Sequence, residues 1–399
     1  MDLAALELLL SPLGQAALLA AGELAPRETE FLSCFKRLSK QFPADVARAA
    51  LQQVLWRQRA ASKFSRAESM YFEREALEQA SGEIIATHRA GRLARFGRVA
   101  DLCCGLGGDA IALAGRTEVL AVDRDPLRLR LAALNLQAYG LSQRVRLVQG
   151  DVLQVDLSGV EAAFADPDRR VDGRRVLSAE QSEPTRSALQ SRFPPDFPLG
   201  IKLAPGLPRG EVDRLTGEVE FLSVAGELKE CVQWTGSLAG PRRRATLLPA
   251  GHTLWATEVP PCPAVEPPGD WLLDPDPAVV RAGLVGELAQ RVDGRLLDPT
   301  IAYLSTRQHI ETPFAQSLAI EESLPFHLGR LRELLRKRGV GTVEIRRRGS
   351  AVEPETLWRQ LRLRGSERRI IVLTQVQAQP WVLVCGSSES RSIPAEIES

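Results

Sequence analysis

Residues 99–108 decide the fold: they read VADLCCGLGG, an apolar run that breaks into a glycine-rich turn. Residues 109–114 (DAIALA) follow the turn and are typical of the start of a helix. A strand that leads through such a turn into a helix lets a ligand come close to bare backbone, with amide groups pointing at it. A second apolar run, EVLAVD at 118–123, ends in an acid about twenty residues beyond the turn, where a carboxylate accepts hydrogen bonds from ribose hydroxyls. The pattern therefore predicts an α/β protein with a nucleoside-bearing cofactor across the first strands of a parallel sheet.

The glycines alone do not identify the nucleoside. Residues 105–110 satisfy the G-x-G-x-x-G/A pattern of dinucleotide-binding proteins, so a nicotinamide or flavin dinucleotide stays open on this feature. Asp101 favours S-adenosylmethionine instead, because it lies inside the first strand, where a dinucleotide-binding strand normally stays apolar. Its carboxylate suits the cationic amino-acid end of S-adenosylmethionine and would repel a pyrophosphate.

Two further acids follow later strands of the predicted sheet. The third strand, 145–148, is followed by Gly150-Asp151-Val152, which are placed to receive the adenine amino group. The fourth strand, 163–165, ends in Asp166-Pro167, at the carboxyl edge where ligands bind in open α/β sheets. The predicted cofactor contacts are Asp101, Gly105 and Gly107 at the methionine end, Asp123 at the ribose, and Asp151 with Val152 at the adenine, with Cys103, Asp109 and Arg124 beside them.

The four cofactor-side motifs, taken in order, resemble those of class I S-adenosylmethionine-dependent methyltransferases. The turn at 101–108 reads D-x-x-C-G-x-G-G, as in the trimethylguanosine synthase-like RNA methyltransferases, and 81–88 (SGEIIATH) resembles their T-P-E-x-I-A-x-H helix. This resemblance runs from Ser81 to Pro167. Over its full length the chain is similar to a bacterial group of methyltransferases with a C-terminal THUMP-like domain. THUMP domains bind RNA, so the resemblance implies S-adenosylmethionine as cofactor and a base in tRNA or rRNA as substrate.

The composition indicates packed cores and gives no global signal for a ligand. The 399 residues are 44% hydrophobic, which suits roughly two to four domains. The 51 basic and 50 acidic residues give a net charge of +1, so total charge does not indicate nucleic acid. Six cysteines without a C-x-x-C pair suit a reducing cytosol, and we expect no metal site. The sequence has neither an apolar run of about 18 residues nor a basic N-terminal region, so we expect a cytoplasmic protein without a membrane partner.

The predicted fold class is α/β, in four domains. Residues 1–92 repeat leucine, alanine and valine at helical spacing and form an N-terminal helical domain. Residues 93–250 form the methyltransferase domain, a Rossmann-like seven-stranded sheet that ends in an antiparallel hairpin around 245–248. Prolines between 260 and 268 indicate a linker. Two small C-terminal α+β domains are expected: 251–320, ferredoxin-like by resemblance, and 321–399, the THUMP-like domain.

Local signals place individual elements within these domains. Asp125 is expected to cap a helix that has Pro126 at its first position. The region before the THUMP-like domain is expected to hold a helix over 278–290. The last domain is expected to alternate helices and strands: helices 328–338 and 353–361, and strands 342–346, 369–374 and 381–385.

Basic residues concentrate near the C-terminus. Residues 330–369 hold 13 arginines and lysines against 5 glutamates, a local charge of +8 in a chain whose total is +1. A cluster of this kind is an electrostatic footprint for phosphates. The alternative is that the basic residues lie on solvated helix faces, because arginine is abundant throughout this sequence. The cluster predicts RNA binding by the last domain.

The chemistry of transfer is expected at 166–170, which read DPDRR. Asp166 and Pro167 stand where amino-group methyltransferases carry [D/N/S]-P-P-[Y/F/W], so they are the predicted catalytic residues. The chain departs from that pattern, with neither a second proline nor an aromatic residue. Arg169 is therefore expected to stack on a base, or Arg169 and Arg170 to hold a phosphate. The structural alternative is an ion pair between Asp168 and Arg170 at the strand end.

Other residues are weaker candidates. Phe72 and Gln79 lie shortly before the first strand and are expected to line the cofactor site. Lys202 and Glu230 lie near strand ends, where they are able to face the same cleft. Cys104 fits the turn as a small side chain, and neither it nor its neighbour Cys103 has a base nearby in sequence that would activate a nucleophile.

Three functions stay open from the sequence. The first is a methyltransferase that acts on RNA. The second is an RNA-associated protein that keeps the cofactor but has lost transfer, which the altered sequence at 166–170 would explain. The third is a methyltransferase of a small molecule or a protein, for which the basic C-terminal cluster would be irrelevant.

Overall fold

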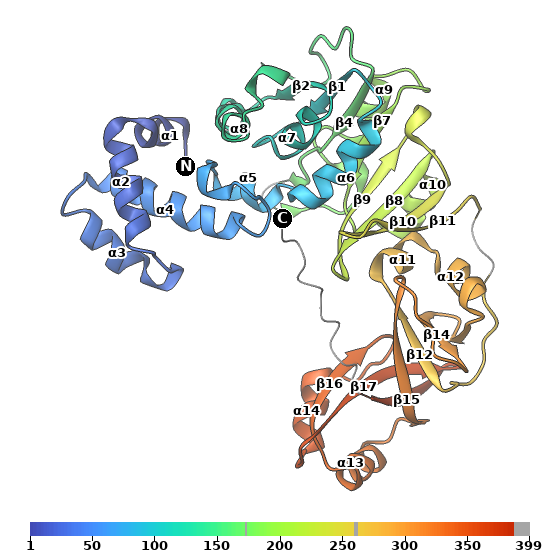
Figure 1. Cartoon of the computed structure of the whole chain (residues 1–399). Coiled ribbons are helices and arrows are strands. Elements are labelled where there is room, and N and C mark those ends of the chain that lie inside the picture. Colours follow the sequence, from blue (N-terminus) through green and yellow to red (C-terminus); the bar gives the residue numbers. More distant parts are fainter. Residues whose placement is uncertain (172–173, 259–261, 387–399) are drawn as a thin grey trace. The chain divides into compact units, whose positions relative to one another are not determined.

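The structure is a computed structural model that describes residues 1–171, 174–258 and 262–386 (Figure 1). The N-terminal region is helical, as predicted. Its elements are α1 (Leu3–Leu10), α2 (Pro12–Glu23), η1 (Glu28–Glu30), α3 (Phe31–Leu38), α4 (Ala44–Ala60), η2 (Ala67–Ser69), α5 (Arg74–Gln79) and α6 (Glu83–Leu93).

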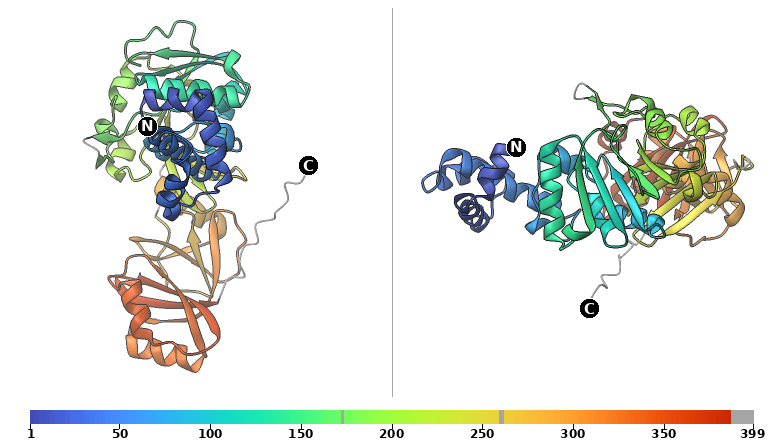
Figure 2. Two further views of the ribbon diagram at one scale, coloured as in Figure 1. Left: turned by 90° about the vertical axis from the view of Figure 1, so that its left-hand side faces the viewer. Right: turned by 90° about the horizontal axis from the view of Figure 1, so that it is seen from above.

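Side-chain caps begin the first two helices. The Asp2 carboxylate accepts a hydrogen bond from the Ala5 amide at 2.8 Å, and Ser11 Oγ accepts one from the Gly14 amide at 3.1 Å. Helices α1 to α4 pack side by side around a shared apolar core that includes Leu9 (Figure 2). In the described part of the chain, no single helix has the length and apolar character of a membrane span. Helices α1 and α2 meet that test of length and composition only together, as a pair bent by 83°.

Strands and helices alternate in the next stretch. The elements are β1 (Arg98–Leu102), α7 (Gly108–Ala114), β2 (Glu118–Asp123), α8 (Pro126–Ala138), η3 (Ser142–Arg144), β3 (Val145–Gln149) and β4 (Ala162–Ala165). Asp125 caps α8, as predicted, because its carboxylate accepts a hydrogen bond from the Leu127 amide at 2.8 Å. Helices α7 and α8 pack on strands β1 to β3, so the apolar strands are covered.

The remaining elements before residue 258 complete the larger sheet and its loops. They are β5 (Arg170–Val171), β6 (Arg174–Arg175), η4 (Ala179–Gln181), α9 (Arg186–Ser191), β7 (Leu199–Leu203), α10 (Arg209–Arg214), β8 (Glu218–Val224), β9 (Glu227–Trp234), η5 (Gly236–Leu238), β10 (Arg243–Leu248) and β11 (His252–Ala256). The sheet follows the order β11-β10-β8-β9-β7-β4-β1-β2-β3. Strands β3, β2, β1, β4 and β7 are parallel, and β9 is antiparallel to β7.

The described strands of this sheet number nine, where the sequence predicts seven. The order β3-β2-β1-β4-β7-β9-β8 accounts for the seven, and β10 and β11 are additional. Residues 245–248, expected in the last hairpin of a seven-stranded sheet, lie in β10, which pairs antiparallel with β11. Strand β11 escapes prediction because it is an edge strand in which Leu254 and Ala256 are the buried residues, so its apolar signal is short.

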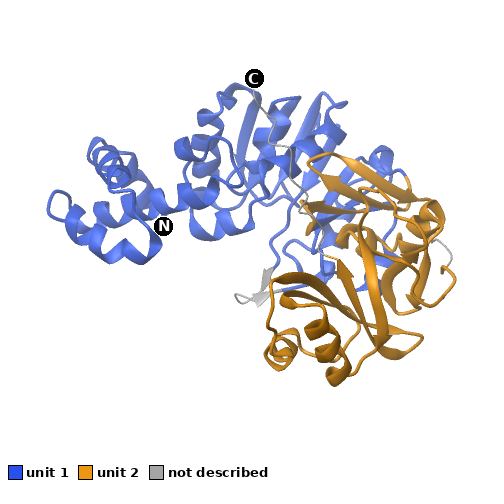
Figure 3. Cartoon of the chain, turned by 60° about the horizontal axis from the view of Figure 1, so that its bottom comes forward, with its two compact units in different colours: residues 1–219, 230–240 blue, residues 220–229, 241–399 orange. Residues whose placement is uncertain are grey.

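The chain divides into two compact units (Figure 3). Unit 1 is Met1–Val219 with Glu230–Gly240, and unit 2 is Glu220–Lys229 with Pro241–Ser399. The later elements of unit 2 are β12 (Trp271–Pro275), α11 (Pro277–Ala282), α12 (Val285–Val292), β13 (Arg295–Asp298), β14 (Ile301–Thr306), β15 (Ala315–Pro325), α13 (Leu328–Lys337), β16 (Val340–Arg347), α14 (Pro354–Leu361), β17 (Glu367–Val376) and β18 (Gln379–Gly386).

One seven-stranded sheet holds both regions that the sequence separates at residue 320. Its order is β13-β14-β12-β15-β18-β17-β16. The expected boundary falls inside β15, whose first half pairs with β12 and whose second half pairs with β18. A strand of 11 residues is long enough to join both sets of partners. The strands of the two expected C-terminal domains, from β12 to β18, therefore belong to one sheet rather than two, whereas β11 belongs to the larger sheet.

Two details of the region on either side of β12 differ from the sequence prediction. The helix expected over 278–290 is two helices, α11 and α12, because Gly283 adopts a left-handed conformation (φ 74°) that ends α11. Part of the predicted linker is paired with β13: Leu296 donates to the Ala264 carbonyl and accepts from the Glu266 amide, both at 2.9 Å. Pro260 and Pro261 of that linker lie outside the described residues.

Candidate active site

A cavity of about 660 Å³ opens at the carboxyl ends of five parallel strands in unit 1. This is the edge where ligands bind in open α/β sheets. The lining comes from the turn after β1, the ends of β2, β3, β4 and β7, α5 with the residues after it, and the loop before α9. It includes Cys103, Gly105, Asp109, Asp123, Arg124, Asp151, Val152, Asp166, Pro167 and Arg169 of the predicted site, together with Gln79, Ser81, Asp168, Ser182, Glu183, Thr185 and Lys202.

The glycine-rich turn has the shape that its sequence predicts. Gly105 has a positive φ of 56°, and a side chain placed there would meet no atom within 4 Å, so the turn forms an open cradle. Gly107 also has a positive φ, of 87°, but it does not line the cavity. A Cβ there would lie 3.2 Å from the Cβ of Ala132 on α8, so this glycine allows α7 and α8 to pack closely.

Asp123 holds the turn and still faces the cavity. One carboxylate oxygen accepts from the Gly105 amide at 2.8 Å, and the other accepts from the Asp125 amide at 3.0 Å. Each carboxylate oxygen has a second lone pair. The Asp123 carboxylate can therefore receive two ribose hydroxyls without losing the contacts that orient it.

Asp101 lies beneath the turn, 1% exposed, and does not itself line the cavity. Its Oδ2 has no hydrogen-bond partner in the described part of the chain. Burial, followed by the charges of Asp109 and Asp166, raises the pKa of Asp101 well above its ordinary value. A buried acceptor without a donor fits the ammonium group of an amino-acid end, so the residues present agree with S-adenosylmethionine.

The predicted residues Asp151, Val152 and Arg124 also line the cavity. Asp151 uses Oδ1 to accept from the Leu153 amide at 2.9 Å, and Val152 is buried beside it. The Arg124 guanidinium pairs with Glu183 at 2.6 Å. That ion pair joins the end of β2 to the loop before α9, on the rim of the cavity.

Asp109 lines the cavity, and its carboxylate is also bound within the protein. Its two carboxylate oxygens receive Arg89 Nε at 2.8 Å and Nη2 at 2.9 Å, and both residues are buried. Arg89 was not singled out from the sequence. Burial and the nearby Asp123 charge raise the pKa of the Cys103 thiol above its ordinary range, so this thiol stays protonated. Within the described ranges, His, Cys, Asp and Glu side chains form no cluster that would hold a metal ion.

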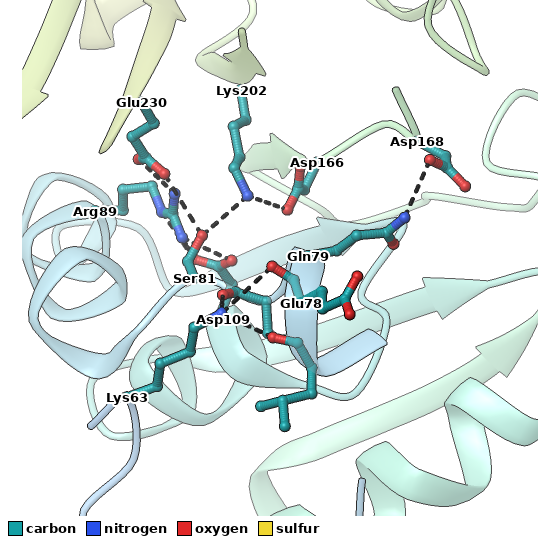
Figure 4. A network of polar contacts seen from close by, with 12 residues as sticks. Lys63, Glu78, Gln79, Ser81, Arg89, Asp109, Asp166, Asp168, Lys202 and Glu230 are labelled. Atoms are coloured by element: carbon teal, nitrogen blue, oxygen red, sulfur yellow. Dashed lines mark hydrogen bonds and ion pairs between the residues drawn. The ribbon is translucent and has the colours of Figure 1, made fainter. Parts of the chain in front are cut away.

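A charged network forms the inner wall of the cavity (Figure 4). Lys202 Nζ donates to Asp166 Oδ2 at 2.6 Å and to Ser81 Oγ at 3.0 Å. Ser81 lies 3.5 Å from Glu230 Oε2, and Glu230 Oε1 pairs with Arg89 Nη1 at 2.6 Å. Lys202 faces the cleft, as one sequence hypothesis allows, whereas Glu230 is buried behind it in the ion pair with Arg89.

The end of α5 and the residues directly after it cover part of the cavity. Lys63 Nζ donates to three of its carbonyls, at Leu77 (2.7 Å), Ala80 (2.9 Å) and Glu78 (3.4 Å). Gln79 lines the cavity, as predicted, and donates to Asp168 Oδ1 at 3.4 Å. The prediction for Phe72 is wrong. This ring is fully buried against Phe64, at 5.9 Å between centroids, and does not reach the cavity.

The residues after Asp166-Pro167 occupy the outer wall. Asp168 and Arg169 line the cavity, and the Asp168 backbone pairs with that of Glu183. Arg170 begins strand β5, and its side chain lies outside the described part of the structure, so the expected Asp168–Arg170 pair stays a prediction. Residues of the loop before α9, expected on the substrate side, lie across the same cavity.

The open sheet, the glycine cradle and the acids at successive strand ends define a class I S-adenosylmethionine-dependent methyltransferase. A curated S-adenosylmethionine-dependent methyltransferase of Mycobacterium tuberculosis H37Rv, itself uncharacterized, is 37% identical over 346 residues, or 84% of this chain and 94% of that protein. The chain belongs to this family of S-adenosylmethionine-dependent methyltransferases. The crystal structure of a methyltransferase candidate from Porphyromonas gingivalis W83 has the same fold, with a TM-score of 0.74 and 21% identity over 91% of this chain and 100% of that one.

Three regions match described families. Residues 96–187 match the RNA cap guanine-N2 methyltransferases, and residues 315–387 match the THUMP domain-like family. Residues 2–60 match a domain of unknown function. The trimethylguanosine synthase of Schizosaccharomyces pombe is 39% identical over 56 residues, which is 14% of this chain and 23% of that enzyme.

Proposed function

We propose that this methyltransferase acts on RNA. The observation that carries the proposal is a set of six arginines in unit 2, five of them exposed, that form no ion pair with any described carboxylate. The matches to an RNA methyltransferase family and to the THUMP domain-like family support the same substrate class. Methyl transfer itself does not depend on this proposal.

The arginines separate into two groups in the structure. Seven of the 13 basic residues in 330–369 pair with carboxylates, some of which lie outside that range: Lys337, Arg338, Arg346, Arg347, Arg348, Arg368 and Arg369. Within the described residues the other six form no ion pair: Arg330, Arg332, Arg336, Arg359, Arg362 and Arg364. These six belong to α13, α14 and the residues beside them, and Arg332 donates to the Gln360 carbonyl at 2.6 Å, which joins the two helices. Positive charge that is not used within the fold is available to phosphates.

An exposed aromatic residue lies beside these arginines. Trp358 on α14 is 59% exposed and lines a groove of about 420 Å³ with Val343, Ile345 and Arg359. Unpaired bases stack on aromatic side chains and on guanidinium planes. The groove therefore supports single-stranded RNA as the ligand of this face.

The residues of unit 1 fit the cofactor and its chemistry. Asp101, the Gly105 turn and Asp123 would hold the amino-acid and ribose ends, and Asp151 with Val152 would hold the adenine. When bound, S-adenosylmethionine supplies an electrophilic methyl group to an acceptor. Asp166, 23% exposed and directed at the cavity, is the acid placed to orient that acceptor.

The proposal is tested with tritiated S-adenosylmethionine and a bacterial extract that is separated into RNA, protein and small molecules. We expect label in RNA with the wild type and none with Asp123→Ala, which loses the ribose acceptor. Nuclease mapping would then find the nucleotide. Label in protein or in small molecules would overturn the RNA proposal. If nothing is labelled although calorimetry shows cofactor binding, the protein binds the cofactor without transfer.

A second candidate is methylation of an amine on a protein or small molecule. The described lining holds eight carboxylates, four basic residues and no aromatic side chain. An acidic lining favours a cationic acceptor, and a base acceptor would have no aromatic ring to stack on within it. The same labelling experiment separates this candidate from RNA methylation.

A further inference from the structure

We propose that Lys202 is a positioning residue for methyl transfer: it holds the Asp166 carboxylate in the orientation in which Asp166 takes the proton of the methyl acceptor. The inference rests on methyl transfer and not on the identity of the acceptor, so it stands whether the acceptor is RNA or another molecule. Its basis is the place of Lys202 in β7 and the network behind it.

The strand register brings the two side chains together. Ala165 of β4 is paired with Ile201 of β7 in a parallel ladder, so the next residues, Asp166 and Lys202, lie side by side at the carboxyl edge. Side chains alternate along a strand, and both of these point into the cavity. The result is the 2.6 Å contact between Lys202 Nζ and Asp166 Oδ2.

The position of Lys202 is unusual because lysine side chains are seldom buried. Lys202 is 5% exposed, in a strand whose other residues are apolar or glycine. Lysine is almost never fully buried without a partner, since its charge loses water. A long apolar side chain would fill this place in β7 with less cost from desolvation. Packing alone therefore does not account for an ammonium at the base of the cofactor cavity.

The surroundings fix where the ammonium sits. Ser81 Oγ accepts a second hydrogen bond from Lys202, and Glu230 lies 3.5 Å behind Ser81. Arg89, 1% exposed, ties Glu230 to Asp109 at the start of α7. This chain of contacts, drawn in Figure 4, anchors Lys202 on one side and leaves Asp166 on the other. The lysine therefore has little freedom to leave the carboxylate.

The free side of Asp166 is the side available to an acceptor. Oδ2 is engaged by Lys202, whereas Oδ1 has no hydrogen-bond partner in the described residues, and Asp166 lines the cavity. The backbone is also fixed, because the Asp166 amide donates to the Leu102 carbonyl at 3.1 Å. One oxygen is thus held by the lysine while the other can accept a hydrogen bond from an N–H or O–H group.

The step balances with this arrangement. The acceptor atom forms a bond to the methyl carbon while the carbon–sulfur bond breaks, and the sulfur keeps that electron pair in the departing S-adenosylhomocysteine. The proton that the acceptor loses goes to Asp166 Oδ1. Lys202 takes no part in this proton transfer; it holds Asp166 Oδ2, which leaves Oδ1 facing the acceptor.

The test is a double-mutant cycle on the full-length protein with Lys202→Met, Asp166→Asn and the double variant. Turnover is measured on whichever extract fraction the wild type labels, and S-adenosylmethionine binding is measured by calorimetry. We expect Lys202→Met to lower kcat by about 10²-fold, with cofactor affinity changed less than about threefold. Because Lys202 acts through Asp166, adding Lys202→Met to Asp166→Asn should cost less than about threefold more.

Two further variants separate positioning from folding. Lys202→Arg keeps the charge and should restore at least a tenth of wild-type kcat, whereas Lys202→Met should not. Lys229→Met removes another lysine–carboxylate pair, to Glu227 at 2.6 Å, on an exposed strand end, and should leave kcat unchanged. Thermal unfolding reports whether each variant folds. If Lys202→Met does not fold, the proposal is tested with the kcat of Lys202→Arg instead.

Several outcomes would overturn the proposal. Losses that multiply in the double variant would mean that Lys202 acts independently of Asp166. Loss of cofactor binding in Lys202→Met, with kcat retained at saturation, would make Lys202 a cofactor residue. A wild type that binds the cofactor but labels no fraction would leave no acceptor proton for Asp166 to take, and the proposal would fail with it. Label in protein rather than RNA overturns the RNA substrate and leaves Lys202 in place.

Discussion

At the scale of single residues, two acids that line the cavity differ in how their carboxylate oxygens are bound. Asp123 has both oxygens tied to backbone amides and remains able to accept hydroxyls. Asp109, at the start of α7, has both oxygens engaged by a buried guanidinium. The two acids look alike in sequence, and they differ because only Asp109 faces Arg89.

Asp101 gives a prediction about pH and cofactor binding. Its pKa is raised by burial above the ordinary 3.8, so the folded apoprotein binds this proton more tightly than the unfolded chain does. Its contribution to stability is present at low pH and is lost as the pH rises through the raised value. Asp101→Asn should therefore make the apoprotein more stable than wild type as the pH rises, because no buried carboxylate has to ionise.

The same substitution should weaken cofactor binding by roughly ten- to a hundredfold, since a charged hydrogen bond contributes about 1.5–3 kcal/mol. Thermal unfolding with and without S-adenosylmethionine, at pH 6 and pH 9, measures both effects. If the cofactor raises the melting temperature of Asp101→Asn as much as that of the wild type, Asp101 does not receive its ammonium group.

At the scale of elements, parallel strand ends bring together residues that are far apart in the chain. The turn after β1, the end of β2 and the ends of β4 and β7 all meet at one cavity. The end of α5 and the residues directly after it close part of that cavity, and this segment is held mainly through backbone carbonyls. A short helix of six residues gives little stability on its own, so this segment depends on the side chain that binds it.

Lys63 is that side chain, and its removal should loosen the segment. Lys63→Met loses three charge-assisted hydrogen bonds to the end of α5. We expect faster hydrogen exchange in peptides over 74–82 and an affinity for S-adenosylmethionine that falls roughly tenfold. Arg74→Met is the matched control, because it breaks an exposed pair with Glu78 on the same helix. Equal exchange in the two variants would show that Lys63 does not hold the segment.

At the scale of the whole molecule, charge is distributed unevenly although its sum is close to zero. The net charge of +1 hides six arginines around α13 and α14 that have no carboxylate partner in the described chain. The other seven basic residues of the cluster form ion pairs with carboxylates. The local charge of +8 therefore overstates the positive charge that is available to a ligand. The six arginines without an ion pair are the ones that predict RNA binding.

The salt dependence of RNA binding measures how many of these arginines contact phosphates. We expect RNA binding to weaken steeply with salt, and Arg359→Gln, Arg362→Gln and Arg364→Gln combined to reduce the slope of log K against log salt by about 2. Neutralising Arg291 and Arg295, each already paired with a carboxylate, is the control and should change the slope little. An unchanged slope in the triple variant would place the phosphate contacts elsewhere.

Trp358 should contribute to RNA affinity without changing the salt dependence of binding, because its side chain is uncharged. Trp358→Ala is expected to weaken binding of single-stranded RNA by about 1–3 kcal/mol, the value of one stacked base, with the salt slope unchanged. Trp358→Phe keeps an aromatic face and should retain most of the affinity. Fluorescence anisotropy with a labelled RNA measures both variants, and equal affinity of Trp358→Ala and wild type would exclude stacking at this groove.

Local patterns in the sequence determined the cofactor half of the protein. The glycine turn, the acids at strand ends and the Asp125 cap each depend on neighbours within a few residues, so their conformations follow from the sequence around them. The same holds for the helices and strands after residue 325, whose periodicity is clear. Strand β11 and the continuous β15 were missed, since edge position and pairing partners leave little trace in a short stretch.

Only the tertiary structure decided what stands behind the cavity. Lys202 meets Ser81 across 121 residues of chain, and Arg89 meets Glu230 across 141. No local signal announces such pairs, apart from a lysine inside an otherwise apolar strand. Buried charges need partners of opposite charge, and which partners they find is set by strand order and register. The sequence by itself therefore determined the turn and the acids that line the cavity, and the packing of distant strands decided which residues surround Asp166.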